Sequence, residues 1–133
     1  MYTAIVLNEG DQEYLREFCE QFQLPDWERK CHHVTFYLGD VKDEHRQHID
    51  KAFLATVDAI GKSDKAIALR VTHIHQCHQH PFVRIVLEKA IPHVTLLVNS
   101  LAGGKAKDSN DITEWEQLKE DIVLQGRLKV VKP

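Results

Sequence analysis

Short runs of β-branched and aromatic residues, each ended by a turn signal, constrain the fold of this chain more than any other feature. Such runs favour strands, because branched and aromatic side chains pack well on a pleated surface. We predict strands over residues 3–7, 31–38, 66–74, 82–87 and 91–98, with further strand segments over 122–124 and 128–131. The 66–74 and 82–87 runs are candidates for a hairpin. A chain divided in this way is not a helical bundle.

Two stretches have the period of a helix. Apolar residues recur at three- and four-residue spacings from Asp11 onwards, which predicts an amphipathic helix carrying Tyr14, Leu15, Phe18, Cys19 and Phe22. A second helix is predicted to end at Gly61, with an apolar stripe of Ile49, Ala52, Phe53, Val57 and Ile60. Thr113 and Glu116 match a capping box and predict a short third helix. The order of elements favours an α+β domain with helices packed on a mainly antiparallel sheet.

Composition limits the class of protein. A chain of 133 residues forms one domain, residues 1–133, and is long enough to bury a core without disulfides or a structural metal. Seventeen Lys and Arg against 20 Asp and Glu give a net charge of −3, which lacks the basic excess of a protein that wraps double-stranded DNA. No stretch reaches the roughly 18 apolar residues of a membrane helix. The three cysteines form no C-x-x-C, so we expect a protein of the reducing cytoplasm.

A tripeptide occurs twice, each time at the start of a predicted strand. The two copies are His33-Val34-Thr35 and His93-Val94-Thr95. Because side chains alternate across a strand, the His and the Thr of each copy share one face, while the Val between them points to the other. If the two strands border one groove, that groove contains two imidazoles and two hydroxyls.

These groups suit phosphodiester hydrolysis. The reaction needs a base for the attacking nucleophile and an acid for the leaving oxygen, and imidazole, with an ordinary pKa of about 6.5, performs either role near neutral pH. The hydroxyls donate hydrogen bonds to the phosphate oxygens as negative charge develops. We therefore predict His33 and His93 as the acid–base pair and Thr35 and Thr95 as phosphate ligands. This chemistry requires no metal and no other cofactor, although which histidine is the base is left open.

The paired motifs resemble the H-x-T-x signature of the 2H phosphoesterases, which include RNA 2′,3′-cyclic phosphodiesterases. Among them the chain looks most like the compact RNA-repair type, such as the cyclic phosphodiesterase domain of fungal tRNA ligases, because residues 105–110 after the second motif are reminiscent of theirs. The resemblance implies a bilobed, pseudo-symmetric α+β fold with both histidines in a central cleft. It also implies a nucleotide or an RNA terminus as substrate, most simply a 2′,3′-cyclic phosphate.

Further residues are candidates for substrate contacts. A polyanionic substrate needs local positive charge that the net charge does not supply, and the candidates are Arg70, Arg84, Lys89, Lys105 and Lys107. Lys105 and Lys107 follow the second motif in a Gly-rich loop that could act as a lid. The aromatic residues that could stack on a base are Tyr2, Trp27, Tyr37 and Phe82, although core packing is the common role of strand aromatics.

The remaining histidines have competing interpretations. Strict alternation turns His32 away from the motif face, which predicts a supporting or surface position. His45 and His48 are expected on the polar side of the second predicted helix. A cluster rich in metal-ligating residues could instead bind zinc, namely His73, His75, Cys77, His78 and His80. The simpler interpretation of the cluster is a polar strand end before Pro81, because all of its ligands come from one local segment.

The leading hypothesis is therefore a metal-independent phosphodiesterase with two-histidine catalysis. One alternative uses the same groups to hydrolyse cyclic di- or oligonucleotide signals. A second alternative is a non-catalytic nucleotide- or RNA-binding module in which the histidines only bind. We expect no membrane partner, and the oligomeric state is not predicted.

Overall fold

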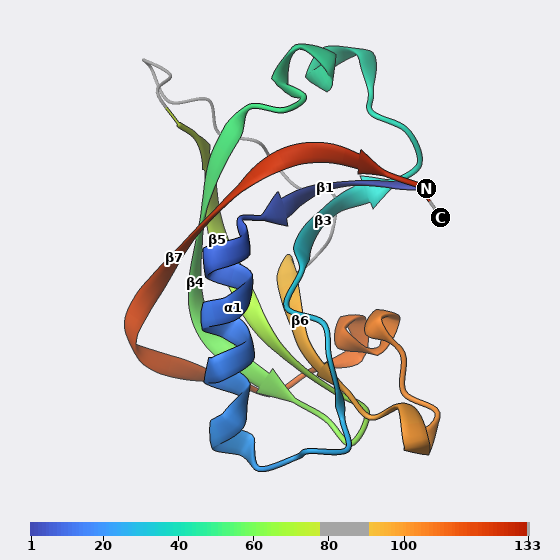
Figure 1. Ribbon diagram of the computed structural model, residues 1–133, viewed down its shortest axis with the longest axis vertical. Helices are drawn as coiled ribbons and strands as arrows, with labels where there is room; N and C mark the ends of the chain where they lie inside the picture. The colour runs from blue at the N-terminus through green and yellow to red at the C-terminus, as the bar shows by residue number, and fades with distance from the viewer. Residues whose placement is uncertain (78–90, 133) are drawn as a thin grey trace.

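The computed structural model describes residues 1–77 and 91–132 (Figure 1). Six antiparallel strands of the described residues close a single barrel in the order β6-β3-β1-β7-β4-β5, and β5 pairs back with β6. The strands are β1 (Tyr2–Leu7), β3 (His33–Leu38), β4 (Ala52–Lys62), β5 (Ala66–Gln76), β6 (His93–Val98) and β7 (Trp115–Val131). A two-residue strand, β2 (Glu28–Arg29), pairs with β6 outside this ring.

The predicted bilobed fold is wrong. A bilobed architecture would put the two motif strands in separate lobes, whereas β3 and β6 are neighbours in one closed sheet. Closure comes from the β5–β6 ladder, which runs from Ala66 opposite Val98 to Arg70 opposite His93. The expectation of a mainly antiparallel sheet is confirmed, because every strand pair is antiparallel.

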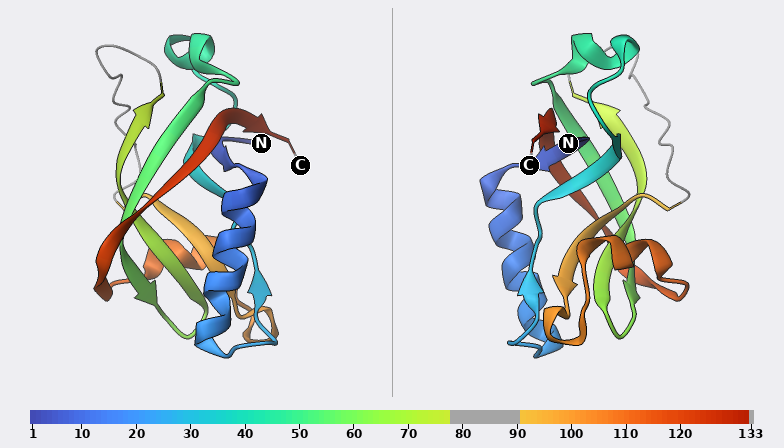
Figure 2. Two further views of the ribbon diagram at one scale, coloured as in Figure 1. Left: turned by 60° about the vertical axis from the view of Figure 1, so that its left-hand side comes forward. Right: turned by 90° about the vertical axis from the view of Figure 1, so that its right-hand side faces the viewer.

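Among the described residues, one α-helix accompanies the barrel. Helix α1 (Glu9–Phe18) confirms the first predicted helix and continues as the 3-10 helix η1 (Cys19–Phe22). Its fully buried residue, Leu15, joins the core. Three further 3-10 helices are η2 (Asp43–His48), η3 (Ser100–Ala102) and η4 (Ala106–Asp111). Figure 2 shows α1 along one side of the barrel and the orange η3–η4 segment beside β6. No helix among the described residues has the length and apolar character to cross a membrane.

The second predicted helix is a strand. Phe53, Ala55, Val57 and Ala59 are fully buried and alternate with more exposed neighbours along β4. The apolar residues of this segment fit both the period of a helix and the two-residue alternation of a strand. The segment forms a strand because it pairs with β5 on one side and with β7 on the other. Gly61 does not end a helix either, because it lies within β4 against the ring of Trp115.

The predicted third helix is also absent from the described chain. Thr113 and Glu116 form no capping box, and β7 begins at Trp115. The two late strand segments are one long strand, which pairs with β4 in its first part and with both β1 and β4 in its last. Leu124, Gly126 and Leu128 alternate with exposed residues, so one face of β7 points into the barrel.

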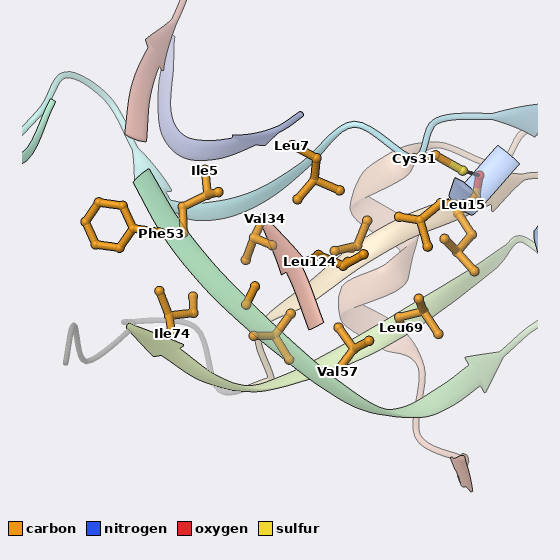
Figure 3. Close-up of a cluster of buried hydrophobic side chains, with 14 of the residues drawn as sticks. Ile5, Leu7, Leu15, Cys31, Val34, Phe53, Val57, Leu69, Ile74 and Leu124 are labelled. Atoms are coloured by element: carbon orange, nitrogen blue, oxygen red, sulfur yellow. Dashed lines mark hydrogen bonds between the residues drawn. The ribbon is translucent and has the colours of Figure 1, made fainter. Parts of the chain in front are cut away.

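The core fills the barrel interior (Figure 3). Val34 and Val94, the middle residues of the two motifs, are both 0% exposed within it. Cys19 and Cys31 lie at its edge beneath α1, with their sulfur atoms 3.6 Å apart. The predicted strand over 82–87, with Phe82 and Arg84, the candidate Lys89 and the cluster residues His78 and His80 lie outside the described residues.

Candidate functional site

The two motifs meet at one residue pair. Val34 on β3 is the direct partner of Val94 on β6. Each valine points into the core, so the His and Thr on either side of it lie on the outer face of the barrel. The four polar side chains of the two copies therefore flank a single Val–Val pair.

A cavity of about 800 Å³ opens over this face. All four motif residues border it, together with residues of β1, of the segment before β3, and of η4. Its lining is Tyr2, Lys30, His32, His33, Thr35, Leu38, His93, Thr95, Ala106, Lys107 and Asn110. The side chains predicted as the acid–base pair and the phosphate ligands thus share one cavity.

The tautomer of His93 follows from its hydrogen bond. Its Nδ1 lies 2.9 Å from the backbone oxygen of Ile91. A carbonyl oxygen only accepts, so Nδ1 of His93 carries the proton and donates it. In the neutral ring the lone pair is then on Nε2.

His32 also lines the cavity, which corrects the expectation that alternation turns it away. The backbone N–H of Cys31 donates to Thr95 O at 3.0 Å, and the residue of β6 just before Thr95, Val94, pairs with Val34. His32 and His33 are therefore extra residues in the β3–β6 ladder, which is a bulge. Cys31 has a left-handed φ of 52°, which turns the chain at this point.

The two neighbouring histidines contact each other. The Nδ1 atoms of His32 and His33 are 3.0 Å apart, and the ring planes are inclined at 80°. On its other side the His33 ring lies against Tyr2, with ring centroids 4.8 Å apart. Burial raises the pKa of the Tyr2 phenol, so this ring is neutral at pH 7.

Thr95 is held by a residue that the sequence did not indicate. Its hydroxyl oxygen lies 2.9 Å from that of Ser109, and Ser109 is buried in η4. This contact joins the second motif to the loop that follows it. Lys107 and Asn110 of η4, in the loop that follows the second motif, line the cavity.

The two predicted loop lysines differ. Lys107 lines the cavity, whereas Lys105 does not. Instead, the backbone N–H of Lys105 donates to Asp108 Oδ2 at 2.7 Å and begins η4. Lys30, which the sequence analysis did not single out, supplies a second lysine from the segment before β3.

Arg70 lies outside the cavity lining. Its guanidinium donates two hydrogen bonds of 2.9 Å to the carboxylate of Asp58 and stacks over the ring of Trp115. This bidentate pair holds the pKa of Asp58 below its ordinary value. Arg70 is thus bonded to Asp58, although it lies on β5 opposite His93 of β6. Arg84, the other predicted arginine, is outside the described residues.

Tyr37 does not line the cavity, and Leu38 does. Thr3 pairs with Tyr37 and the next residue, Ala4, pairs with Thr35, which leaves Phe36 as an extra residue in the β1–β3 ladder. This second bulge reverses the alternation after Thr35. Tyr37 is consequently buried, with its hydroxyl 2.9 Å from His45 Nδ1 and accepting from the backbone N–H of Lys42.

The alternative zinc cluster is only partly described. His73 and His75 stack on β5 with ring centroids 5.9 Å apart. Across residues 1–77 and 91–132, no group of three or more His, Cys, Asp or Glu residues is arranged to hold a metal ion. His45 and His48 lie on η2 rather than on an α-helix.

No protein-family model, curated protein or solved structure matches this chain. The assignment of function therefore rests on the residues around the cavity.

Proposed function

We propose that the protein is a phosphodiesterase that acts without a metal on a nucleotide or RNA-end phosphodiester, with a 2′,3′-cyclic phosphate as the preferred substrate. The supporting observation is that His33, Thr35, His93 and Thr95 border one cavity. Two imidazoles and two hydroxyls from a repeated motif make up the full set of groups that this hydrolysis needs.

The spacing of the motif residues suits a single phosphate. His33 and Thr35 flank Val34 on β3, His93 and Thr95 flank Val94 on β6, and the two valines are paired. This arrangement supports the proposal that the two imidazoles reach opposite sides of one phosphorus atom. One ring faces the attacking water and the other faces the leaving ribose oxygen.

The reaction balances with these groups alone. The neutral imidazole takes a proton from water while the water oxygen bonds to phosphorus. The bond from phosphorus to the 2′ or 3′ oxygen breaks, and the charged imidazole gives that oxygen a proton. The product is a phosphomonoester with a free neighbouring hydroxyl, and the two histidines have exchanged protonation states.

The hydroxyls and the lysines stabilise the negative charge. Thr35 donates to a phosphate oxygen, and Thr95 does the same when Ser109 donates to it, because one hydroxyl has one proton to give. Lys30 and Lys107 add positive charge at the cavity wall. A chain with a net charge of −3 gains its affinity for an anion only from such local groups.

The test is hydrolysis of a substrate panel in EDTA by the wild type and by His33→Ala and His93→Ala. The panel holds 2′,3′-cyclic mononucleotides, a 3′,5′-linked dinucleotide and cyclic dinucleotides. We expect turnover of the 2′,3′-cyclic substrates, reduced by about 10² to 10⁴ in each variant. His73→Ala, at an exposed position on β5 away from the cavity, is the matched control and keeps full activity.

Other outcomes separate the alternatives. Turnover confined to the cyclic dinucleotides would assign the protein to the hydrolysis of signalling nucleotides. Binding of the nucleotides without turnover, weakened by either variant in equilibrium titrations, would make it a binding module and contradict the proposal.

A further inference from the structure

The groups that contact Nδ1 of the two motif histidines are unlike each other. Nδ1 of His93 faces a backbone carbonyl at 2.9 Å, and Nδ1 of His33 faces a second imidazole nitrogen, that of His32, at 3.0 Å. A carbonyl oxygen has no proton to give, whereas an imidazole both gives and accepts protons. The two halves of the repeated motif therefore differ in how they handle a proton.

The contact between His32 and His33 contains a proton. Two ring nitrogens at 3.0 Å form a hydrogen bond only if one of them is protonated and the other offers a lone pair. When the pair carries one positive charge, an N–H of the charged ring donates to the neutral ring, and such charge-assisted bonds are the stronger kind. The bulge after Cys31 brings both rings to the cavity and so makes this contact possible.

His93 is suited to the opposite role. Because its Nδ1 donates to Ile91 O, its neutral ring exposes a lone pair at Nε2 and accepts a proton there. His33 has a further option, since His32 can pass a proton to its Nδ1 while Nε2 gives one away. His33 thus has in His32 a neighbour that can resupply a proton.

We infer that His32 is a positioning residue that shares a proton with His33, which makes the His32–His33 pair the general acid and His93 the general base. This inference rests on the proposed function, and it assigns the roles that the pseudo-symmetric motifs leave open. In the reaction, water loses a proton to Nε2 of His93 and the leaving ribose oxygen gains one from Nε2 of His33. The pair then holds a single bridging proton and no net charge.

Other ionisable groups face the pair. They are Tyr2 on β1, Lys30 beside the bulge, His93 on β6 and Lys107 on η4.

The test uses two leaving groups. A ribose oxygen needs a proton as it departs, whereas p-nitrophenolate, the leaving group of a nucleoside p-nitrophenyl phosphodiester, does not. We expect His32→Leu to lower kcat on a 2′,3′-cyclic nucleotide about tenfold to hundredfold and to change kcat on the p-nitrophenyl ester less than about threefold. His93→Ala lowers kcat on both substrates, because both need the base.

Two more variants sharpen the result. His32→Asn places an amide oxygen where it can accept from His33 Nδ1–H but cannot supply a proton, so it restores part of the loss in His32→Leu. His73→Leu is the matched control, because His73 is an exposed histidine of β5 whose ring contacts Thr72 instead of a cavity residue. Equal kcat values of wild type, His32→Leu and His32→Asn on both substrates would overturn the inference and leave the proposed function intact.

A second readout is independent of activity. The ¹⁵N chemical shifts of the labelled imidazole rings report which nitrogens carry protons. We expect His93 to be protonated at Nδ1 and the His32–His33 contact to hold one proton. Unprotonated Nδ1 atoms on both His32 and His33 would overturn the inference, even if no substrate of the panel is hydrolysed. Failure of the wild type to hydrolyse any substrate would instead remove the proposed function.

Discussion

The hydroxyl groups of Thr95 and Ser109 lie 2.9 Å apart and tie β6 to η4. Ser109 is 2% exposed, while Thr95 borders the cavity, so this bond is partly buried. It fixes the rotamer of a motif threonine and holds the segment that carries Lys107 over the cavity. The second motif is thus completed by a residue fourteen positions further along the chain.

We expect the loss of this bond to lower activity more than it lowers the stability of the fold. We expect Ser109→Ala to lower kcat/KM about fivefold, the equivalent of about 1 kcal/mol for one hydrogen bond. Ser100→Ala is the control, since Ser100 lies on η3 and donates to the exposed carboxylate of Glu28. Equal kinetic effects of the two substitutions would contradict this role of Ser109.

Substitution of the two loop lysines should affect substrate binding differently. Lys107→Met removes a charge from the cavity wall, and we expect it to raise KM about tenfold, with a weaker dependence of KM on salt. Lys105→Met leaves the cavity charge unchanged, because only the backbone of Lys105 takes part in starting η4. Its KM should stay within about twofold of the wild-type value. Steady-state kinetics at two ionic strengths measures both quantities.

The bulge at Phe36 predicts opposite effects for two adjacent residues. Tyr37→Phe removes a buried hydroxyl bonded to His45 and Lys42, and we expect a loss of about 1 kcal/mol in the free energy of unfolding with unchanged kinetics. Leu38 is 82% exposed and borders the cavity, so Leu38→Ala should alter KM and leave the stability within about 0.5 kcal/mol. A change in KM for Tyr37→Phe together with a loss of stability for Leu38→Ala would show that strict alternation continues past Thr35.

The Asp58–Arg70 pair predicts a pH-dependent contribution to stability. Because Arg70 lowers the pKa of Asp58 in the folded protein, the contribution is complete well above the unfolded value of about 3.9 and is lost as the pH falls through the folded value. We expect Asp58→Asn to cost about 1 kcal/mol at neutral pH, with the difference narrowing below about pH 4. Denaturant unfolding across pH measures this. Asp26→Asn, at an exposed turn residue, is the control substitution.

Barrel packing predicts that Gly126 tolerates no side chain. A Cβ at this position would collide with the backbone oxygen of Val6 and the side chain of Ile5, where β7 passes β1. We expect Gly126→Ala to destabilise the protein by about 1–3 kcal/mol. Gly10→Ala in α1 meets no atom within 4 Å and should stabilise it by up to about 1 kcal/mol through helix propensity. Thermal unfolding of both variants tests the contrast.

The local pattern of the sequence predicted α1 and most strands, because the apolar residues of each of these segments match either the helical period or the strand period, but not both. The 52–62 segment matches two periods, and only its ladders with β5 and β7 decide that it is a strand. The closed barrel was not predicted, because closure depends on the pairing of β5 with β6, and no local feature of either strand encodes its partner.

The four motif residues were predicted together from the repeat alone, and the structure brings them to one cavity. His32 and Leu38 were missed for a common reason. Each lies in or after a bulge, where extra residues interrupt the strict alternation of side chains along β3. Ser109 was missed because its contact with Thr95 depends on how the loop after β6 folds back, which no periodicity describes.

The valines of the two motifs fill the barrel while the histidines and threonines project from it. Substitutions on this outer face leave the interior packing untouched, so the chemistry of the protein and the stability of its scaffold can vary separately. A scaffold of this kind can acquire a new specificity through changes in η4 and the bulged segment without first gaining a reserve of stability.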